Sequence, residues 1–427
     1  MTKVPRLLRS LQPWAGPVLR ATSQLAGPLL KVVSKPLGLR ALPRGSMVSL
    51  GSGRQHRSSW EVTGDATPHR DEISAVDGIP RGYPTLAPSR TIESTGPYVV
   101  RLTGGRVVGE YAAIITHENK LLQDLSPYFS VTRPSQHPIF RRAWLPSPER
   151  LQGRVGVIHT RKADNYYHFM IDIVPRIAIL AEAGLLSGLD AVLAASSMPY
   201  QREILSLTGV PVDRLISPSR RTHLIGDELI VPCVPTDGKR IPGWACRAIG
   251  DLFPGLRGPL SPVEPRRRIY ISRGDSPRTR RVANEPELEP VLARWGIERV
   301  SLDSMSVSEQ AKMFRQAELI VAPHGAALVN VAFCEPGTKI LELFSPRYVN
   351  YCFRIIAGLC GLDYSYVLGE GHASRLRGDH FDVSADITIS RRDVETALSG
   401  LVQGMLPRSG RSSGGSFAPS GDHQRRE

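Results

Sequence analysis

The stretch between Arg268 and Phe344 constrains the fold more than any other part of this chain. Short runs rich in β-branched and other apolar residues alternate there with segments whose apolar residues recur at helical spacing. Strands are expected at residues 268–272, 297–302, 318–322 and 338–344. Successive parallel strands need long crossover connections, which are usually helices. The sequence therefore predicts an α/β fold with a parallel sheet in this half of the chain.

Helix signals lie between these expected strands. Asn284 and Glu285 open one helical segment. The run Ser306–Glu309 matches a capping box, in which the Ser oxygen and the Glu carboxylate each satisfy a free N–H at the helix start. Apolar residues follow at spacings of three and four: Val307, Ala311, Phe314 and Ala317. A third helix is expected over residues 326–332, directly after the strand that ends near Pro323.

Groups that suit a phosphate follow two of these strands. Arg273 comes directly after the first strand, and His324 and Gly325 stand at the start of the helix that opens at Ala326. Further arginines continue the first loop: Arg278, Arg280 and Arg281. Ligands of parallel sheets bind at the carboxyl ends of strands, helix N-termini attract anions, and arginine bonds phosphate oxygens in pairs.

We interpret these groups as a diphosphate site formed by Arg273, His324, Gly325 and Ala326. Arg280 or Arg281 is a further phosphate contact, and Glu285 orients an arginine or a ribose hydroxyl. The alternative is that the arginines form a solvated loop and His324 is a turn residue. Both features in one strand–helix array favour the phosphate site.

A second functional stretch runs from Asn165 to Arg176. Asn165 is expected to cap a helix on which His168, Asp172 and Arg176 fall four apart, on one face. The opposite face is apolar and expected to pack inward: Phe169, Ile173, Ile177 and Leu180. Pro175 removes an N–H and is expected to kink the helix.

This row predicts a general base and its support, because His or Asp can take a proton from a hydroxyl. We favour Asp172 as the base and His168 as its partner or as a ligand of the acceptor, with the reverse assignment left open. Asn165 and Arg176 are expected to contact the acceptor or to support the base. The alternative is a surface face with an ordinary Asp172–Arg176 ion pair, which stabilises little.

The remaining chain divides at changes of composition. Residues 1–90 are basic, rich in Pro, Gly and Ser, and expected to be disordered. Residues 91–240 are expected to form a first α/β domain. Its strands are predicted at residues 98–102, 107–116, 154–159 and 191–195, with Gly104-Gly105 as a hairpin turn. Residues 241–405 form the second α/β domain, and residues 406–427 a disordered tail.

Charge and cysteine usage bear on location and partners. The net charge is +14, and ten Lys and Arg residues precede the first acidic residue, Glu61. Such a basic segment can contact anionic lipid, whereas the alternatives are a disordered tail or an overlong start with Met47 as the first residue.

The five cysteines are odd in number and form no C-x-x-C, so we expect free thiols in a reducing cytoplasm. We expect a cytoplasmic protein with peripheral contact at the inner membrane face, and no specific nucleic acid partner.

Several motifs resemble glycosyltransferase family 61, which includes capsular polysaccharide biosynthesis proteins and eukaryotic xylosyl- and N-acetylglucosaminyltransferases. The motifs are Tyr270–Asp275, Arg280–Glu285, Ala322–Leu328, Glu335–Leu343 and the Asn165–Asp172 run. The resemblance covers about residues 165–367. It implies a GT-B fold, with two Rossmann-like domains facing a cleft. It also implies an inverting hexosyl- or pentosyltransferase that takes a nucleotide-sugar donor on residues 241–405 and a saccharide acceptor on residues 91–240.

No cofactor and no metal are expected. The chain contains no Asp-x-Asp pair, and arginines with a helix dipole can neutralise a diphosphate instead. Two readings remain as alternatives to the glycosyltransferase. One is a pyruvyl or phosphosugar transferase that modifies polysaccharide, and the other is a non-catalytic protein whose basic tail binds nucleic acid or the cell envelope.

Overall fold

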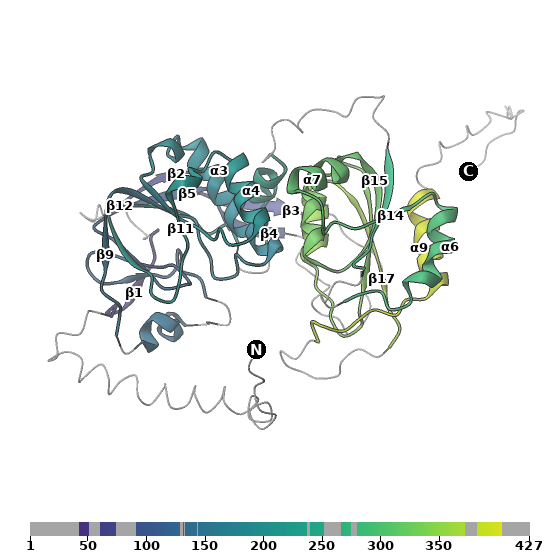
Figure 1. Ribbon diagram of the computed structural model, residues 1–427, viewed down its shortest axis with the longest axis horizontal. Helices are drawn as coiled ribbons and strands as arrows, with labels where there is room; N and C mark the ends of the chain where they lie inside the picture. The colour runs from purple at the N-terminus through teal and green to yellow at the C-terminus, as the bar shows by residue number, and fades with distance from the viewer. Residues whose placement is uncertain are drawn as a thin grey trace, which may run out of the picture.

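The coordinates are a computed structural model. It describes residues 42–50, 60–73, 91–128, 131, 133–142, 144–236, 240–251, 266–274, 280–371 and 382–403. A mixed sheet with its helices forms the first half of the fold, and a parallel sheet covered by helices forms the second half (Figure 1). The tail predicted at residues 406–427 lies outside the described residues.

The second half contains a parallel sheet, as predicted. Its strands are β13 (Arg267–Ile271), β14 (Glu298–Val300), β15 (Ala317–Pro323), β16 (Lys339–Phe344) and β17 (Asp363–Leu368). Their spatial order is β14-β13-β15-β16-β17, and every neighbouring pair is parallel. The chain leaves β13 toward β14 on one side and then returns to β15 on the other side. The strand order therefore reverses between β13 and β15, which is where such sheets bind ligands.

Helices cover both faces of this sheet because its strands are apolar on both faces. Figure 1 shows α6 (Glu285–Arg294) and α9 (Arg391–Gln403) side by side on the outer face. They pack on Tyr270, Leu319, Val321 and Leu341. The alternate strand residues Ile269, Ile271, Ile320 and Ile340 belong to the inner core.

The inner face carries α7 (Val307–Gln316), η9 (Ala326–Phe333) and α8 (Cys352–Leu359). The capping box of α7 is confirmed: Ser306 Oγ accepts from Glu309 N at 3.2 Å, and Ser306 N donates to Glu309 Oε2 at 2.8 Å. Ala317, predicted within this helix, is instead the first residue of β15. The helix predicted after Gly325 is a 3₁₀ helix, η9.

The first half is built on a mixed sheet ordered β1-β8-β7-β6-β12-β9-β10-β11, with β5 paired to β12 and β2 paired to β5. The bounds are β1 Ser46–Met47, β2 Trp60–Gly64, β5 Tyr98–Thr103, β6 Arg106–Val108, β7 Ala113–Ile115, β8 Leu121–Leu122, β9 Glu149–Val157, β10 Ala191–Leu193, β11 Leu215–Ile216 and β12 His223–Pro232. Strands β9 to β12 pair in parallel, and β12 pairs antiparallel with β5 and β6. The α/β class is thus confirmed, whereas the antiparallel extension departs from the Rossmann-like first domain that was expected.

The predicted hairpin at Gly104-Gly105 is wrong. Strands β5 and β6 lie end to end along one partner, β12, instead of pairing with each other. Gly104 N donates to Asp227 O, where the register of β12 shifts. The reversal occurs later, between β6 and β7, where Gly109 has a φ of +77°. Adjacent glycines thus mark an irregularity in a continuous strand pairing here.

The prediction of disorder for residues 1–90 is wrong where the structure describes this region. Strand β2 pairs antiparallel with β5, and β1 pairs parallel with β8. A separate hairpin joins β3 (Pro68–Glu72) to β4 (Thr91–Thr95), and Asp71 Oδ2 accepts from Gly243 N at 2.7 Å. The segment expected to contact anionic lipid falls mostly on residues 1–41, which lie outside the described residues.

The two halves share one continuous apolar core. It joins residues of β9 and β10 to residues of β15, η9 and α8. Polar contacts cross the same junction: Tyr166 Oη donates to Asn330 Oδ1 at 2.7 Å, and the Glu203 carboxylate accepts from the free N–H groups of Val307 and Ser308. Helix α5 (Gly243–Gly250) contacts α3, η9 and α8 at this junction. None of the helices that the structure describes combines the length and apolarity needed to cross a bilayer.

Two thiols at this junction lie close together. Cys246 Sγ on α5 is 3.3 Å from Cys360 Sγ, at the end of α8. All five cysteines are free, as expected. The hydrogen bond from Cys246 lowers the pKa of the Cys360 thiol, which favours the thiolate that attacks in disulfide chemistry.

We therefore expect diamide treatment of the native protein to produce a Cys246–Cys360 disulfide before any other. The oxidant removes two electrons and two protons as one S–S bond forms. Alkylation followed by peptide mass spectrometry detects the bond, and Cys233→Ser serves as the control that still forms it. A first disulfide that leaves both Cys246 and Cys360 alkylated would contradict this expectation.

Candidate functional site

A small pocket lies where the strand order of the parallel sheet reverses. It occupies about 80 Å³ at the carboxyl ends of β13, β14 and β15, and its lining includes Ser272, Arg273, Asp303, Gly325 and Ala326. Pockets that enclose a whole small-molecule ligand measure roughly 300–1,000 Å³. This pocket therefore has room for part of such a ligand.

Arg273 lies directly against the start of η9. Its Nη1 donates to the carbonyl oxygen of His324 at 3.3 Å. A Cβ on Gly325 would stand 3.0 Å from the same Nη1, although the extended φ of Gly325, −177°, suits any residue. A side chain at this position would therefore crowd the guanidinium and force it to shift. The guanidinium and the free N–H groups of η9 together form a positive cradle.

The side chain of His324 does not line this pocket. Its Nδ1 lies 2.5 Å from Oε1 of Glu342, a carboxylate with no exposed surface, and Tyr364 Oη donates to Glu342 Oε2 at 2.5 Å. Because a carboxylate only accepts, His324 Nδ1 carries the proton, and Nε2 is the ring atom left for another group. The ring stacks on Phe344 at 5.2 Å and contacts Phe353 at 5.1 Å.

The two other arginines predicted to contact phosphate, Arg280 and Arg281, lie in different environments. The Arg280 guanidinium lies 5.0 Å above the Tyr348 ring, which in turn contacts His324, and burial lowers the pKa of Arg280. Arg280 also adopts a φ of +68°, a backbone strain that tends to occur at functional sites. Arg281 pairs with Asp386 through its backbone and side chain.

Glu285 pairs with Arg299, whereas Arg273 is the arginine beside the pocket. It accepts from Tyr270 Oη, from Ser272 Oγ at 2.7 Å and from Arg299 Nε. Its contact with Ser272 holds the first residue after β13 in place beside Arg273. Glu285 therefore supports the loop of the pocket from behind.

The predicted base segment is helical, with an unusual centre. Helix α2 (Tyr166–His168) passes into a π-helix, η5 (Phe169–Ile173), and then into α3 (Val174–Glu182). Asn165 Oδ1 accepts from His168 N, so the predicted cap is present. Val174 N–H bonds Phe169 O, five residues back. The wider turn accommodates Pro175, so the predicted kink takes the form of a π-helical segment.

His168 and Asp172 meet as their spacing predicted. His168 Nδ1 lies 3.1 Å from Asp172 Oδ2, and Thr236 Oγ1 donates to Asp172 Oδ1 at 2.7 Å. The Asp172 side chain is 7% exposed and that of His168 13%. A nearly buried carboxylate is thus oriented by two separate groups. The predicted apolar face is buried in the core.

Arg176 does not share the face of this pair, which corrects the predicted row of three. Its guanidinium is buried and donates to the carbonyl oxygens of His159, Val157 and Pro232. Burial lowers its pKa to about 10. The π-helical turn alters the four-residue spacing, so Arg176 binds the ends of β9 and β12. Arg176 is thus neither a contact of the acceptor nor one half of a surface ion pair with Asp172.

The two clusters are joined by a chain of ring contacts across the junction. His168 contacts Tyr167 at 5.3 Å, Tyr167 contacts Phe353 at 5.4 Å, and Phe353 contacts His324. Tyr167 follows directly on Tyr166, whose hydroxyl binds Asn330 of η9. The segment with the candidate base therefore packs on the same elements that form the cradle.

Three residues of these clusters were not predicted: Thr236, Glu342 and Tyr364. A charged residue inside the apolar run Lys339–Phe344 is a signal that could have singled out Glu342, because buried carboxylates need partners. Thr236 and Tyr364 carry no comparable signal. No group of His, Cys, Asp and Glu residues suited to a metal ion occurs within the described ranges.

The fold and these clusters define an α/β protein whose parallel sheet presents a cradle at its switch point. The sequence profile described as Glycosyltransferase 61 matches residues 166–341. The chain therefore carries a glycosyltransferase family 61 domain, which confirms the resemblance inferred from its motifs. The match includes His168, Asp172 and His324, and it ends one residue before Glu342.

Similar proteins include eukaryotic transferases. The chain is 34% identical over 96 residues to protein O-linked-mannose beta-1,4-N-acetylglucosaminyltransferase 2 of Tetraodon nigroviridis, covering 21% of this chain and 16% of that protein. It is 30% identical over 129 residues to the EGF domain-specific O-linked N-acetylglucosamine transferase of Drosophila melanogaster, covering 27% and 24%. The matches thus span a quarter or less of these relatives.

Among solved structures, the bacterial iron-containing dodecameric glycosyltransferase TibC of enterotoxigenic E. coli aligns with 74% of this chain and 88% of its own. The TM-score is 0.32 and the identity is 10%.

Proposed function

We propose that this protein is an inverting glycosyltransferase with a GT-B arrangement of its two halves. It moves a sugar from a nucleotide-sugar donor to a saccharide hydroxyl, with capsular or other surface polysaccharide as the acceptor class. The family 61 domain supports the transferase class. The observation that carries the proposal is the oriented His168–Asp172 pair, linked through Tyr167 and Phe353 to the cradle beside His324.

The donor diphosphate would bind the cradle. Arg273 and the N–H groups that follow Gly325 would hold its oxygens. Outside this pocket, Arg280 and the protonated form of His324, through Nε2–H, would add positive groups. Charge builds up on the diphosphate as its bond to the sugar breaks. Donors that are already in place stabilise that charge without reorganising, which is often the largest catalytic contribution.

The acceptor hydroxyl would lose its proton to Asp172. As the O–H bond breaks, the oxygen attacks the anomeric carbon, and the bond from that carbon to the diphosphate breaks on the opposite side. One displacement inverts the configuration and releases a nucleoside diphosphate. His168 and Thr236 hold the carboxylate in position, and in the reverse assignment His168 takes the proton.

A panel of nucleotide sugars tests this proposal, with product mass spectrometry and an assay for released nucleoside diphosphate. At least one donor is expected to release its nucleoside diphosphate in the presence of oligosaccharide acceptors. Sugar transfer without that release would favour a pyruvyl or phosphosugar transferase. Loss of all ligand binding on deletion of residues 1–41, which leaves β1 and β2 in place, would favour the non-catalytic alternative.

Activity is expected to survive chelation by EDTA. The chain has no Asp-x-Asp pair, and Arg273 with the amides of η9 supplies positive charge to the diphosphate. Initial rates with and without EDTA should agree within about twofold. Complete loss of the rate in EDTA, restored by Mn²⁺, would contradict this prediction.

A further inference from the structure

A second, larger pocket lies in the first half of the protein. It measures about 390 Å³, a volume that suits a mono- or disaccharide. It is located at the carboxyl ends of three parallel strands, where β9 is followed by His159, β10 by Ser196 and β11 by Ser217. Glu110, Arg161 and Asp164 complete this polar lining.

His159, which lines this pocket, has an unused acceptor. Its Nε2 donates to the carbonyl oxygen of Glu110 at 3.0 Å, so the proton of the neutral ring lies on Nε2 and Nδ1 keeps a lone pair. Burial lowers the pKa of His159 to about 4, which keeps the ring neutral at physiological pH. Nδ1 is buried and has no hydrogen-bond partner within the described part of the chain. Because buried polar atoms are nearly always satisfied, Nδ1 is suited to a donor from a ligand, such as a hydroxyl.

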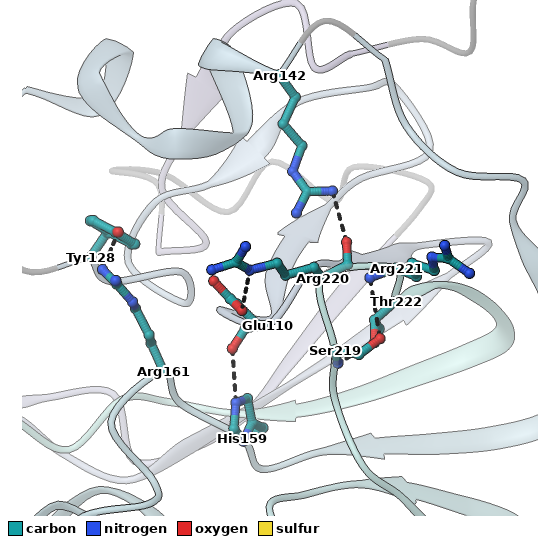
Figure 2. A network of polar contacts seen from close by, with 9 residues as sticks. All are labelled: Glu110, Tyr128, Arg142, His159, Arg161, Ser219, Arg220, Arg221 and Thr222. Carbon is teal, nitrogen blue, oxygen red and sulfur yellow. Dashed lines mark hydrogen bonds and ion pairs between the residues drawn. The ribbon is translucent and has the colours of Figure 1, made fainter. Parts of the chain in front are cut away.

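Arg161 lines the same pocket, and Arg142 and Arg220 lie to one side of it (Figure 2). Arg220 Nε pairs with the Glu110 carboxylate at 3.3 Å, which cancels that charge. Arg142 donates to the carbonyl oxygen of Arg220 and lies over the Tyr111 ring, and Arg161 donates to Tyr128 Oη and lies over that ring. These contacts hold two guanidinium groups in place without neutralising them.

The charge balance beside the pocket is positive by one. Arg142 and Arg161 have no carboxylate partner among the residues that the structure describes, whereas one carboxylate of the lining, Asp164, is unpaired. An anion is therefore favoured here, and arginine binds carboxylate or phosphate oxygens well. The lone pair of His159 and the serine hydroxyls meanwhile suit a ligand rich in hydroxyl groups.

We propose that this pocket binds an anionic saccharide. A sugar hydroxyl donates to His159 Nδ1, and a carboxylate or phosphate substituent pairs with Arg161 and the neighbouring arginines. Resting on the proposed function, this saccharide is the acceptor. The connection 160–165 runs from His159 directly into the helix with His168 and Asp172, so the pocket and the candidate base lie at the two ends of one short loop.

Calorimetric titration of the full chain without any donor tests the pocket directly. The probes are a hyaluronan tetrasaccharide for the carboxylate, mannose 6-phosphate for the phosphate, and cellotetraose and mannose as their neutral counterparts. At least one anionic probe is expected to bind about tenfold or more tightly than its neutral counterpart, because charge-assisted bonds are added. Rising salt should weaken the anionic probe selectively.

Variants locate the binding. Arg161→Ala removes an exposed side chain and should reduce affinity for the anionic probe about tenfold. His159→Gln keeps an N–H that can reach Glu110 O but leaves no acceptor at the position of Nδ1, and it should weaken both probes of the pair. Arg392→Ala, an exposed arginine on α9 in the other half, is the matched control and should bind like the wild type.

Equal affinity for the anionic and neutral probes, no binding of any probe, or equal affinity of Arg161→Ala and Arg392→Ala would overturn the proposal. Inorganic phosphate that binds as tightly as mannose 6-phosphate would overturn its saccharide part. The donor assay separates the two inferences. If an anionic saccharide binds but no nucleotide sugar releases its nucleoside diphosphate, the proposal for the pocket holds and the proposed transferase activity is wrong.

Discussion

Replacement of Asp172 by Asn is expected to reduce turnover by about 10²–10⁴-fold, the usual contribution of general-base catalysis. The substitution keeps the shape of the side chain and removes its basicity. Thr236 can still donate to the remaining carbonyl oxygen, and the amide remains within reach of His168 Nδ1. The nucleoside diphosphate should bind Asp172→Asn as it binds the wild type, because the cradle is formed by other elements.

Initial rates at saturating donor, together with calorimetry of the diphosphate, check this prediction. Asp213→Asn is the matched control, since that carboxylate is 79% exposed and lies far from both clusters in the sequence. Near-normal turnover of Asp172→Asn combined with an inactive His168→Ala would reverse the two roles. If both variants keep wild-type turnover, the segment serves only as scaffold and the base lies elsewhere.

His168 and Thr236 are expected to act as positioning residues in this scheme. Thr236→Val removes one donor to Asp172 and keeps the side-chain volume, so we expect a smaller loss of turnover than with Asp172→Asn. An unchanged Km for the donor would place the defect in the acceptor half of the reaction.

The second large effect is expected at the cradle. Arg273→Ala should weaken nucleoside-diphosphate binding by about tenfold or more, because a charge-assisted hydrogen bond contributes roughly 1.5–3 kcal/mol. Gly325→Ala should act in the same direction, since its Cβ would stand 3.0 Å from Arg273 Nη1 and displace the guanidinium. Arg273→Lys restores the charge without the paired donors, so only partial recovery is expected.

His324 needs a conservative variant beside the truncation. His324→Ala should also weaken diphosphate binding about tenfold, but it leaves the buried Glu342 carboxylate with Tyr364 as its remaining partner and is expected to lower stability. His324→Gln retains a donor in the cluster. Calorimetry on variants that show wild-type unfolding temperatures separates the two effects.

Arg294→Ala is the control for the cradle, because Arg294 pairs with Glu395 on the outer helices. Its affinity for the diphosphate should equal that of the wild type. If Arg273→Ala and His324→Gln both bind the diphosphate as tightly as Arg294→Ala does, the proposed donor site is wrong.

The sequence by itself determined the features that depend on near neighbours in the chain. The parallel strands of the second half, the capping box at Ser306 and the cap at Asn165 follow from local periodicity and from hydrogen bonds within a few residues. The His168–Asp172 contact is local in the same sense. The positions of Arg273 and Gly325 could also be predicted from the sequence, because parallel strands present their carboxyl ends at one edge of the sheet.

Only the tertiary structure decided which distant groups meet. Nothing near Glu342 in the chain indicates that His324 and Tyr364 will satisfy its buried carboxylate, and nothing near Arg176 indicates that it will bind carbonyl oxygens of β9 and β12. The collinear strands around Gly104 depend on their common partner β12, more than a hundred residues away. The pocket beside His159 likewise forms only where three strand ends converge. The free-energy cost of an unsatisfied polar group depends on its burial and on its long-range partners. Neither of these can be read from a local sequence pattern.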